Sequence, residues 1–301
     1  MKDRHPWFMK YSLSPRNTGP CELHDPMQRM SYLIYFPEII GMSVHHAKDG
    51  WLLMYKKLSS ELFFFNPLTK KRINLPSCEC YNESAAFTCA PTSESCLVFG
   101  MAHIHNYNVG INTLKLGETK WDTTCSMSFE RNLSSNNKII FLEGLFYCLF
   151  GLDWISVFDP SKRTMEGYCI KYDRSLGQGS TGTYFVEIKG DIFLIKTFTD
   201  EKLRLFRLNQ DRAGWSWEEK DKIDEASTIF GASCVSECRS DLPKCLRSKL
   251  LLSDAPHPMI NTYYFDGGRY VTNDSEIPFW DRAAKYQCVW IEPPKQCLDF
   301  I

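Results

Sequence analysis

The sequence predicts an all-β protein, a β-propeller of about six four-stranded blades, with five or seven blades as alternatives. Three observations support this prediction. An apolar, strand-like run recurs along the chain, a hairpin signal recurs between these runs, and no segment shows a convincing long helical pattern. Both markers return at intervals of roughly 45–50 residues, the period of a kelch-like propeller blade. One sheet of this size cannot cover both of its faces, so copies of it must pack around a ring.

The first marker is an apolar run of aromatic and branched residues, often directly after glycine, which is typical of a buried strand. These runs begin at Gly50, Cys96, Gly144 and Gly190, and more weakly at Ile229. The second marker is a strand, a turn and a shorter strand that often ends in Trp or Pro. These hairpins begin at Leu62, Ile111, Trp154 and Leu203, and a fifth begins at Asn261. Additional strands are expected over residues 43–47, 138–143 and 183–188, each just before a glycine-led run.

Residues 49–76 show one repeat unit in detail. The run LFFF at 62–65 is too short for a helix, and its lack of polar residues predicts a strand that is buried on both faces. Asn66-Pro67 predicts a turn, since proline presets φ and the asparagine side chain can bond the backbone ahead of it. Ile73 and Leu75 then alternate with polar residues, which is the period of a half-buried strand.

Organisation beyond the repeat is less clear. We expect residues 1–30, which contain four prolines, to be an irregular N-terminal segment, and residues 31–301 to be a single propeller domain. A ring needs a seal between its first and last blades, and the apolar runs at 30–36 and 288–294 are the expected strands of that seal. The charged stretch 217–226 is expected to be strand end and loop. A large β-sandwich, or two smaller β domains, is the alternative architecture.

Composition excludes several classes of protein. The chain of 301 residues carries 35 Lys and Arg against 36 Asp and Glu, a net charge of −1, which argues against a nucleic-acid partner. No apolar run approaches the roughly 20 residues that span a bilayer, and the start lacks a secretory signal. We therefore expect no membrane partner and a cytoplasmic or nuclear location, with the 13 cysteines reduced. The Asn-x-Ser matches at Asn82, Asn132 and Asn273 are then accidental.

Two motifs resemble nucleotide-binding signatures. GQGSTG at residues 177–182 has the GxGxxG spacing, and VEIK at 186–189 resembles a kinase lysine motif. A dinucleotide site needs a helix after the glycines, whereas the following residues are strand-like. A kinase needs a longer gap and HRD and DFG segments, which the sequence lacks. We interpret this segment as a loop between blades.

Other candidate sites are weak. Cys234, Cys238, Cys245 and His257 could form a zinc site, but chance clusters are expected in a cysteine-rich chain. The pairs Cys78/Cys80, His45/His46 and His103/His105 lack a clear further ligand. The basic residues at 70–72 and 162–163 are interpreted as solvated blade edges, and Trp121 and Trp215 as blade packing. We assign no catalytic, cofactor-binding or metal-binding residue, expect no cofactor, and leave the partner-binding residues open.

Several motifs resemble the plant F-box-associated KIB-type β-propeller family. They follow in that family's order: HPWFM at 5–9, KDGWLLM at 48–54, FNPLT at 65–69, LP at 75–76, FVEIKGDIFL at 185–194, ID at 223–224 with IFG at 229–231, and WIEP at 290–293. Each motif is modest, and the stretch at 223–231 departs from the pattern. Together they cover nearly the whole chain.

The resemblance implies a propeller that recognises a protein destined for ubiquitylation. Members typically carry an F-box ahead of the propeller, which binds the Skp-type adaptor of a cullin ligase. Only residues 1–4 precede the first motif, whereas an F-box takes roughly 40–50 residues. We therefore expect that this chain does not bind the Skp-type adaptor directly.

Two functions follow as hypotheses. The first is a non-enzymatic protein-interaction domain, whose loops at one mouth of the ring bind a target protein. The second is an enzyme that uses a pocket in the central channel. An enzyme should show clustered histidines and carboxylates with perturbed pKa values there, and an adaptor a broad mixed surface.

Overall fold

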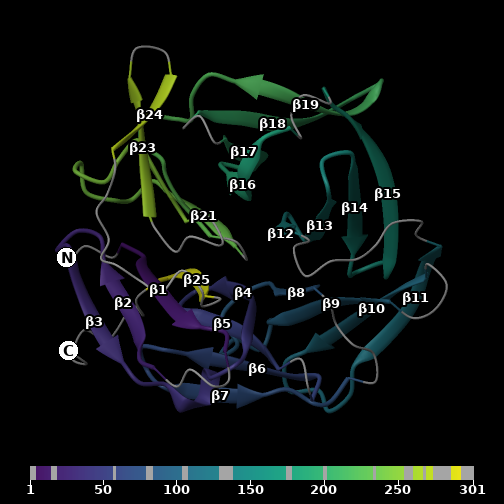
Figure 1. The fold of residues 1–301 in the computed structure, drawn as a ribbon. Helices are drawn as coiled ribbons and strands as arrows, with labels where there is room; N and C mark the ends of the chain where they lie inside the picture. The colour runs from purple at the N-terminus through teal and green to yellow at the C-terminus, as the bar shows by residue number, and fades with distance from the viewer. Residues whose placement is uncertain are drawn as a thin grey trace.

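The computed structural model describes residues 5–14, 19–56, 59–78, 84–103, 108–128, 138–173, 178–198, 202–232, 235–253, 260–266, 269–273 and 286–292. These residues form strands β1 to β25 and one short 3-10 helix, η1 (Pro37–Ile39). The strands are arranged in six blades around a common centre (Figure 1), which we number in chain order. The expected all-β propeller is confirmed.

Blades 1 to 3 are four-stranded antiparallel sheets. Blade 1 contains β1 (Trp7–Ser12), β2 (Cys21–Asp25), β3 (Met30–Ile34) and the C-terminal β25 (Tyr286–Ile291). Blade 2 contains β4 (Ser43–Lys48), β5 (Trp51–Lys56), β6 (Glu61–Asn66) and β7 (Lys71–Asn74). Blade 3 contains β8 (Ser84–Phe87), β9 (Leu97–His103), β10 (Asn108–Lys115) and β11 (Asp122–Ser128).

Blades 4 and 5 share one continuous eight-stranded sheet. Blade 4 contains β12 (Lys138–Leu142), β13 (Leu145–Phe150), β14 (Trp154–Asp159) and β15 (Thr164–Lys171). Blade 5 contains β16 (Ser180–Ile188), β17 (Asp191–Phe198), β18 (Leu203–Asp211) and β19 (Gly214–Lys220). Their outermost strands are joined by parallel pairing of Ile170 with Trp215 and of Lys171 with Ser216. The stretch 217–226 is strand end and loop, as the sequence predicts.

Blade 6 differs from the expected four-stranded pattern. It contains β20 (Thr228–Gly231), β21 (Ser236–Arg239), β22 (Lys249–Ser253), β23 (Ile260–Asp266) and β24 (Arg269–Asn273). The chain folds back after β20, so that β21 pairs antiparallel on the inner side of β20 and β22 pairs parallel on its outer side. The blade therefore has five strands, and β21 faces the centre of the ring (Figure 1).

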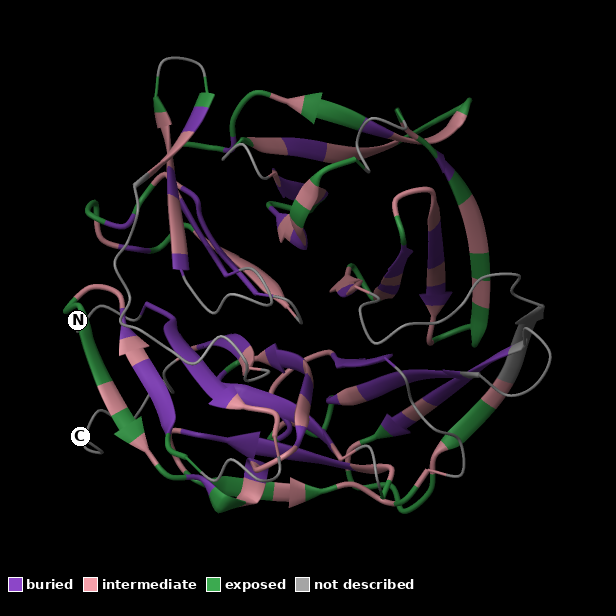
Figure 2. Ribbon diagram, viewed as in Figure 1, coloured by how far each residue is buried: buried purple, intermediate pink, exposed green. Residues whose placement is uncertain are grey.

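The core consists of apolar clusters that fill the spaces between neighbouring blades. Among the described residues there are six such clusters, one for each blade interface. In β6, Phe63 and Phe65 join the cluster shared with blade 1, whereas Phe64 joins the cluster shared with blade 3. Successive side chains of a strand point to opposite faces, so an inner strand must be apolar throughout. Figure 2 shows the resulting buried central strands and exposed outer strands.

The unit at 49–76 folds as predicted. Residues 62–65 are buried, and the Asn66 side chain accepts hydrogen bonds from the backbone N–H groups of Leu68 (3.1 Å) and Thr69 (2.9 Å). These bonds stabilise the turn between β6 and β7. The four other predicted hairpins also form, as β10–β11, β14–β15, β18–β19 and β23–β24.

The expectation of an irregular segment over residues 1–30 is wrong, because β1 and β2 lie within it and pair in blade 1. Trp7, Phe8 and Met9 are all buried, and the described prolines Pro6, Pro20 and Pro26 fall just outside the strands. The ring is sealed by β25, which pairs with β1 along the full length of both strands. The predicted C-terminal strand of the seal is therefore correct, but the run at 30–36 contributes β3 at the outer edge of blade 1 instead.

Candidate functional site

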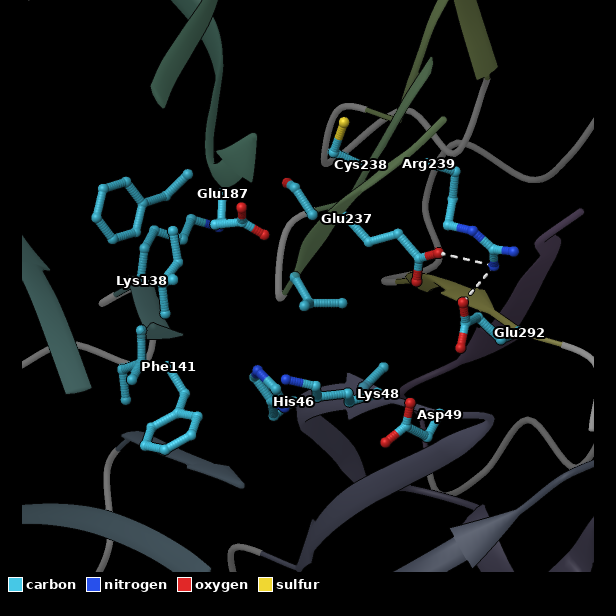
Figure 3. A pocket seen from close by; sticks show the side chains of 16 residues that line it. His46, Lys48, Asp49, Lys138, Phe141, Glu187, Glu237, Cys238, Arg239 and Glu292 are labelled. Carbon is cyan, nitrogen blue, oxygen red and sulfur yellow. Dashed lines mark hydrogen bonds and ion pairs between the residues drawn. The ribbon is translucent and has the colours of Figure 1, made fainter. Parts of the chain in front are cut away.

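A pocket of about 210 Å³ lies where the innermost strands of the blades converge. Its lining comes from β4, β12, β16 and β21, and from the residue that follows β25 (Figure 3). Charged residues dominate this lining: Lys48, Asp49, Lys138, Glu187, Glu237, Arg239 and Glu292. Because each comes from a paired strand or its immediate end, the positions are held by backbone ladders and not by long loops.

Histidine 46 reaches the pocket from a β-bulge in β4. The pairing of β4 with β5 shifts between Val44 and His46, so His45 is the extra residue of the bulge. Bulges redirect side chains and are common next to functional sites. The His46 ring is 7% exposed and packs edge-on against Phe87 at 5.0 Å, and its Nδ1 has no hydrogen-bond partner among the described residues. Burial, assisted by the charge of Lys48, lowers the pKa of His46 to about 3, so the ring is neutral at pH 7.

Arginine 239 connects three carboxylates. Its Nε and Nη2 atoms donate to the two Asp241 oxygens at 2.8 and 2.7 Å, a bidentate pair, and its Nη1 atom donates to Glu292. Glu237 lies farther away, with 3.7 Å between its Oε1 and Nη1 (Figure 3). The contact with Glu292 joins blade 6 to the end of the closing strand β25. Hydrogen bonding to Asp241, together with the neighbouring carboxylates, raises the pKa of Arg239, so its charge is permanent.

Glutamate 237 is a buried acidic group of the pocket whose pKa is strongly raised. Burial and then the neighbouring Glu292 carboxylate raise its pKa well above the usual value, and Arg239 only partly opposes this effect. Its Oε1 atom accepts no hydrogen bond from the described residues. A desolvated carboxylate of this kind is a candidate for proton exchange or for binding a cation.

Two other carboxylates of the pocket are held by backbone groups. Glu187 Oε1 accepts a hydrogen bond from the Gly190 N–H at 2.6 Å, across the turn between β16 and β17. Asp49 Oδ2 accepts one from the Ala90 N–H at 2.9 Å, which links blade 2 to blade 3. These bonds fix the direction of two acidic side chains, which lie on different sides of the pocket (Figure 3).

The nucleotide-like motifs form no nucleotide site. Ser180, in the GxGxxG segment, begins strand β16, so a strand and not a helix follows the glycines; Gly177 lies outside the described residues. Lys189 of the VEIK segment occupies the turn after β16, where it pairs with Asp224 at 2.7 Å. Among the described residues of these motifs, Glu187 alone lines the pocket.

The candidate metal residues are not brought together in the part of the chain that the structure describes, where no group of three His, Cys, Asp or Glu could hold a metal ion. Cys238 lies on β21 at the pocket, and Cys245 is exposed. Four of the other candidates lie outside the described residues: Cys80, His105, Cys234 and His257. In the His45/His46 pair, His46 lines the pocket and His45 packs against Tyr55.

The basic segments lie at exposed turns, where they form ion pairs. Arg72 contacts Glu61, and Arg163 contacts Asp122. Lys162 pairs with Asp159 at 3.0 Å. Trp121 is a packing residue, since its Nε1 donates to the Pro76 carbonyl at 2.8 Å and its ring joins the cluster between blades 2 and 3.

Sequence reasoning missed the cluster of Glu237, Arg239 and Glu292. Two signals in the sequence bear on it. Glu237 and Arg239 are two apart on a short strand and so share a face, and Glu292 falls within the closing WIEP motif. No local pattern places these two segments together, because β21 and the end of β25 meet only when the ring closes.

Comparisons with known proteins agree with this geometry. The sequence profile of the KIB1-4 β-propeller family matches residues 22–271. An F-box/kelch-repeat protein of Arabidopsis thaliana is 31% identical over 99% of this chain and 85% of its own length. An F-box protein of the same plant is 31% identical over 98% of this chain and 78% of its own, and a second F-box/kelch-repeat protein is 34% identical over 98% and 76%.

The described residues contain no helix with the length and apolar character needed to cross a membrane. Six blades, a closing strand from the C-terminal end and the span of the family match point to one conclusion: this chain is a member of the KIB1-4 β-propeller family, homologous to plant F-box proteins.

Proposed function

We propose that this chain is a non-enzymatic protein-recognition domain, the target-binding part of an F-box-type ubiquitin ligase adaptor, and that it binds its target at the central pocket. The observation that carries the proposal is the convergence of charged side chains from several blades on one pocket. Mixed charges held by strands suit recognition of a protein surface, because they give specificity and orientation. Homology to F-box proteins supplies the ligase context.

Affinity capture from plant tissue, followed by mass spectrometry, tests the proposal. Ser236 lines the pocket on β21, and Ser236→Arg would place a bulky cation there. Thr92 is exposed in the loop before β9, so Thr92→Arg is the matched control. The target should be captured by the wild type and by Thr92→Arg, and should be lost with Ser236→Arg. Capture that is equal for all three proteins would refute binding at the pocket.

The direct contact with a Skp-type adaptor stays a prediction. We expect the purified chain not to bind that adaptor, and a full-length F-box relative is the positive control. The cytoplasmic or nuclear location likewise stays a prediction, which imaging of a fluorescent fusion in plant cells tests.

Acid–base catalysis is the second candidate, and the raised pKa of Glu237 is the observation that favours it. The other groups of the pocket support it poorly. Burial raises the pKa of the Cys238 thiol to about 11, so it is protonated at neutral pH, and His46 has no partner at Nδ1 to orient its ring. Turnover of chromogenic ester, phosphate or glycoside substrates that disappears in Glu237→Gln would support an enzyme.

A further inference from the structure

Among the described residues, the Glu237 carboxyl group of the central pocket has no cation within hydrogen-bond distance. Arg239 is engaged by the bidentate contact with Asp241 and by Glu292. The remaining ion pair, from Arg239 to Glu237, spans 3.7 Å and is too long for a hydrogen bond. Glu237 therefore sits beside a cation whose donors point mainly to other residues.

Acidic groups of the pocket outnumber its basic groups. Four carboxyl groups line it, against three cations: Asp49, Glu187, Glu237 and Glu292, with Lys48, Lys138 and Arg239. Burial and Glu292 raise the pKa of Glu237, and a cation placed beside Glu237 would favour its ionised form. His46 adds no charge, since burial keeps its ring neutral, yet its Nδ1 is a buried polar atom without a partner in the described residues. An acidic group without a close cation, and a wall imidazole that adds no positive charge, favour a cationic ligand over an anionic one.

An aromatic wall faces this charged side. Phe141 of β12 and Phe185 of β16 line the pocket, and Figure 3 shows Phe141 on the opposite side from Glu237. Such a wall can cover the aliphatic stem of a long basic side chain, and an aromatic face also attracts a cation.

The size of the pocket limits what can enter. Its volume of about 210 Å³ far exceeds the ~10–15 Å³ that one water requires. It is smaller than the roughly 300–1,000 Å³ of typical metabolite or cofactor sites. The space suits a single side chain with a few waters.

We propose that the pocket receives the ammonium or guanidinium group of a lysine or arginine side chain from the target protein, with Glu237 as the acceptor and Phe141 against the aliphatic stem. The proposal rests on the function proposed above, and it names the chemistry that the target must present. The target's backbone stays outside, so recognition depends on a basic residue exposed on a turn or a chain end.

Calorimetric titration of the full chain tests the proposal with defined probes. The cationic probes are Ac-Gly-Lys-Gly-NH₂ and Ac-Gly-Arg-Gly-NH₂, and the norleucine tripeptide keeps the stem without the charge. A single side chain should bind with a dissociation constant of about 1 mM. The norleucine peptide should bind at least tenfold more weakly, and equal binding of the neutral peptide would overturn the proposal.

Variants assign the binding to Glu237. Glu237→Gln keeps the shape and should weaken both cationic peptides by about tenfold, whereas Glu237→Asp keeps the charge and should stay within about threefold. Glu94→Gln removes an exposed carboxylate outside the pocket and should change nothing. Thermal unfolding verifies that each variant is folded, and Glu237→Asp retains a test if the Gln variant does not fold. Undiminished binding by Glu237→Gln contradicts the assignment.

A free amine is the other source of the same chemistry, and n-butylamine tests for it. Butylamine and the lysine peptide should bind within about threefold of each other, because only the side chain enters. Butylamine binding without peptide binding would overturn the proposal of a protein side chain. If Ser236→Arg abolishes target capture but no cationic probe binds, this inference fails and the recognition function stands. If the probes bind but target capture is unaffected by Ser236→Arg, the proposed binding of the target at the pocket fails.

Discussion

Replacement of Trp290 by alanine should open the seal of the ring. Trp290 lies on the closing strand β25 and is 2% exposed. Its ring packs between Phe8 of blade 1, at 5.0 Å, and Phe230 of blade 6, at 4.9 Å, and its Nε1 donates to the Gly231 carbonyl at 3.1 Å. One side chain thus connects the first blade to the last.

The magnitude follows from these contacts. Truncation of a buried tryptophan to alanine costs about 3–5 kcal/mol, which includes the cavity it leaves. Trp290→Phe preserves most of the packing but leaves the Gly231 carbonyl without its donor, at a cost of about 1–3 kcal/mol. For a domain of 301 residues, with an unfolding entropy of about 0.6 kcal/mol/K, 4 kcal/mol corresponds to a fall of roughly 6 °C in melting temperature.

Urea unfolding, followed by far-ultraviolet circular dichroism, measures these costs. Trp215 is the control, because it is only half-buried on the outer strand β19, where it contacts Tyr168 at 5.3 Å. Trp215→Ala should cost clearly less than Trp290→Ala, with Trp290→Phe between Trp290→Ala and the wild type. Equal losses for the two alanine variants would show that the seal does not control stability.

Three further predictions concern the pocket, a turn beside it and the cysteines. Glu237→Gln should flatten the pH dependence of stability. A carboxyl group whose pKa is raised on folding stabilises the protein only while it is protonated, so the stability of the wild type should fall as the pH rises above the unfolded pKa of about 4.3. Melting temperatures measured between pH 5 and 8 would show this difference. Gly50→Ala should cost about 2–3 kcal/mol in urea unfolding, because Gly50 has φ +77° and an added Cβ would lie 2.7 Å from the Glu292 carbonyl oxygen. Iodoacetamide should modify exposed Cys169 in the native protein but leave Cys148, whose thiol pKa is raised by burial, unmodified until unfolding, as peptide mass spectrometry would detect.

Each has a matched control. Gly190 has φ +87° with open space around the added Cβ, so Gly190→Ala should cost only about 1 kcal/mol, and equal costs at both glycines would rule out the clash. Glu94→Gln should leave the pH profile unchanged, and a wild-type profile in Glu237→Gln would mean that Glu237 is solvated. Modification of Cys148 at the rate of Cys169 would contradict the packing between blades 3 and 4.

The parts of the fold that sequence predicted are those set by local pattern. A hairpin depends on a few adjacent residues, such as Asn66 and the apolar run before it, so the five predicted hairpins are all present. The five-stranded arrangement of blade 6 was not predicted. Its strands β20 and β22 pair in parallel although β21 lies between them in the sequence, and such pairing leaves no alternation in the sequence to mark it.

The N-terminal strands and the pocket depend on distant partners. Residues 7–12 have little strand signal of their own beyond a short apolar run, and they become a strand because β25 and β2 flank them. Arg239 and Glu292 are 53 residues apart and meet only at the seal. The spacing of apolar and turn residues within a segment therefore predicts blades. A site formed by residues of different blades cannot be predicted until the closed ring shows which segments meet.

At the outer rim of the ring, strand β15 of blade 4 pairs with strand β19 of blade 5, so these two outer strands cover part of each other's edge. Outer edges of sheets expose unpaired backbone groups that can recruit other chains, and here two such edges cover one another at Ile170 and Lys171. Blades 4 and 5 are thereby joined by backbone pairing at the rim in addition to the apolar cluster between them. Separation of these two blades must break this backbone pairing, whereas separation at the seal must break the contacts of Trp290.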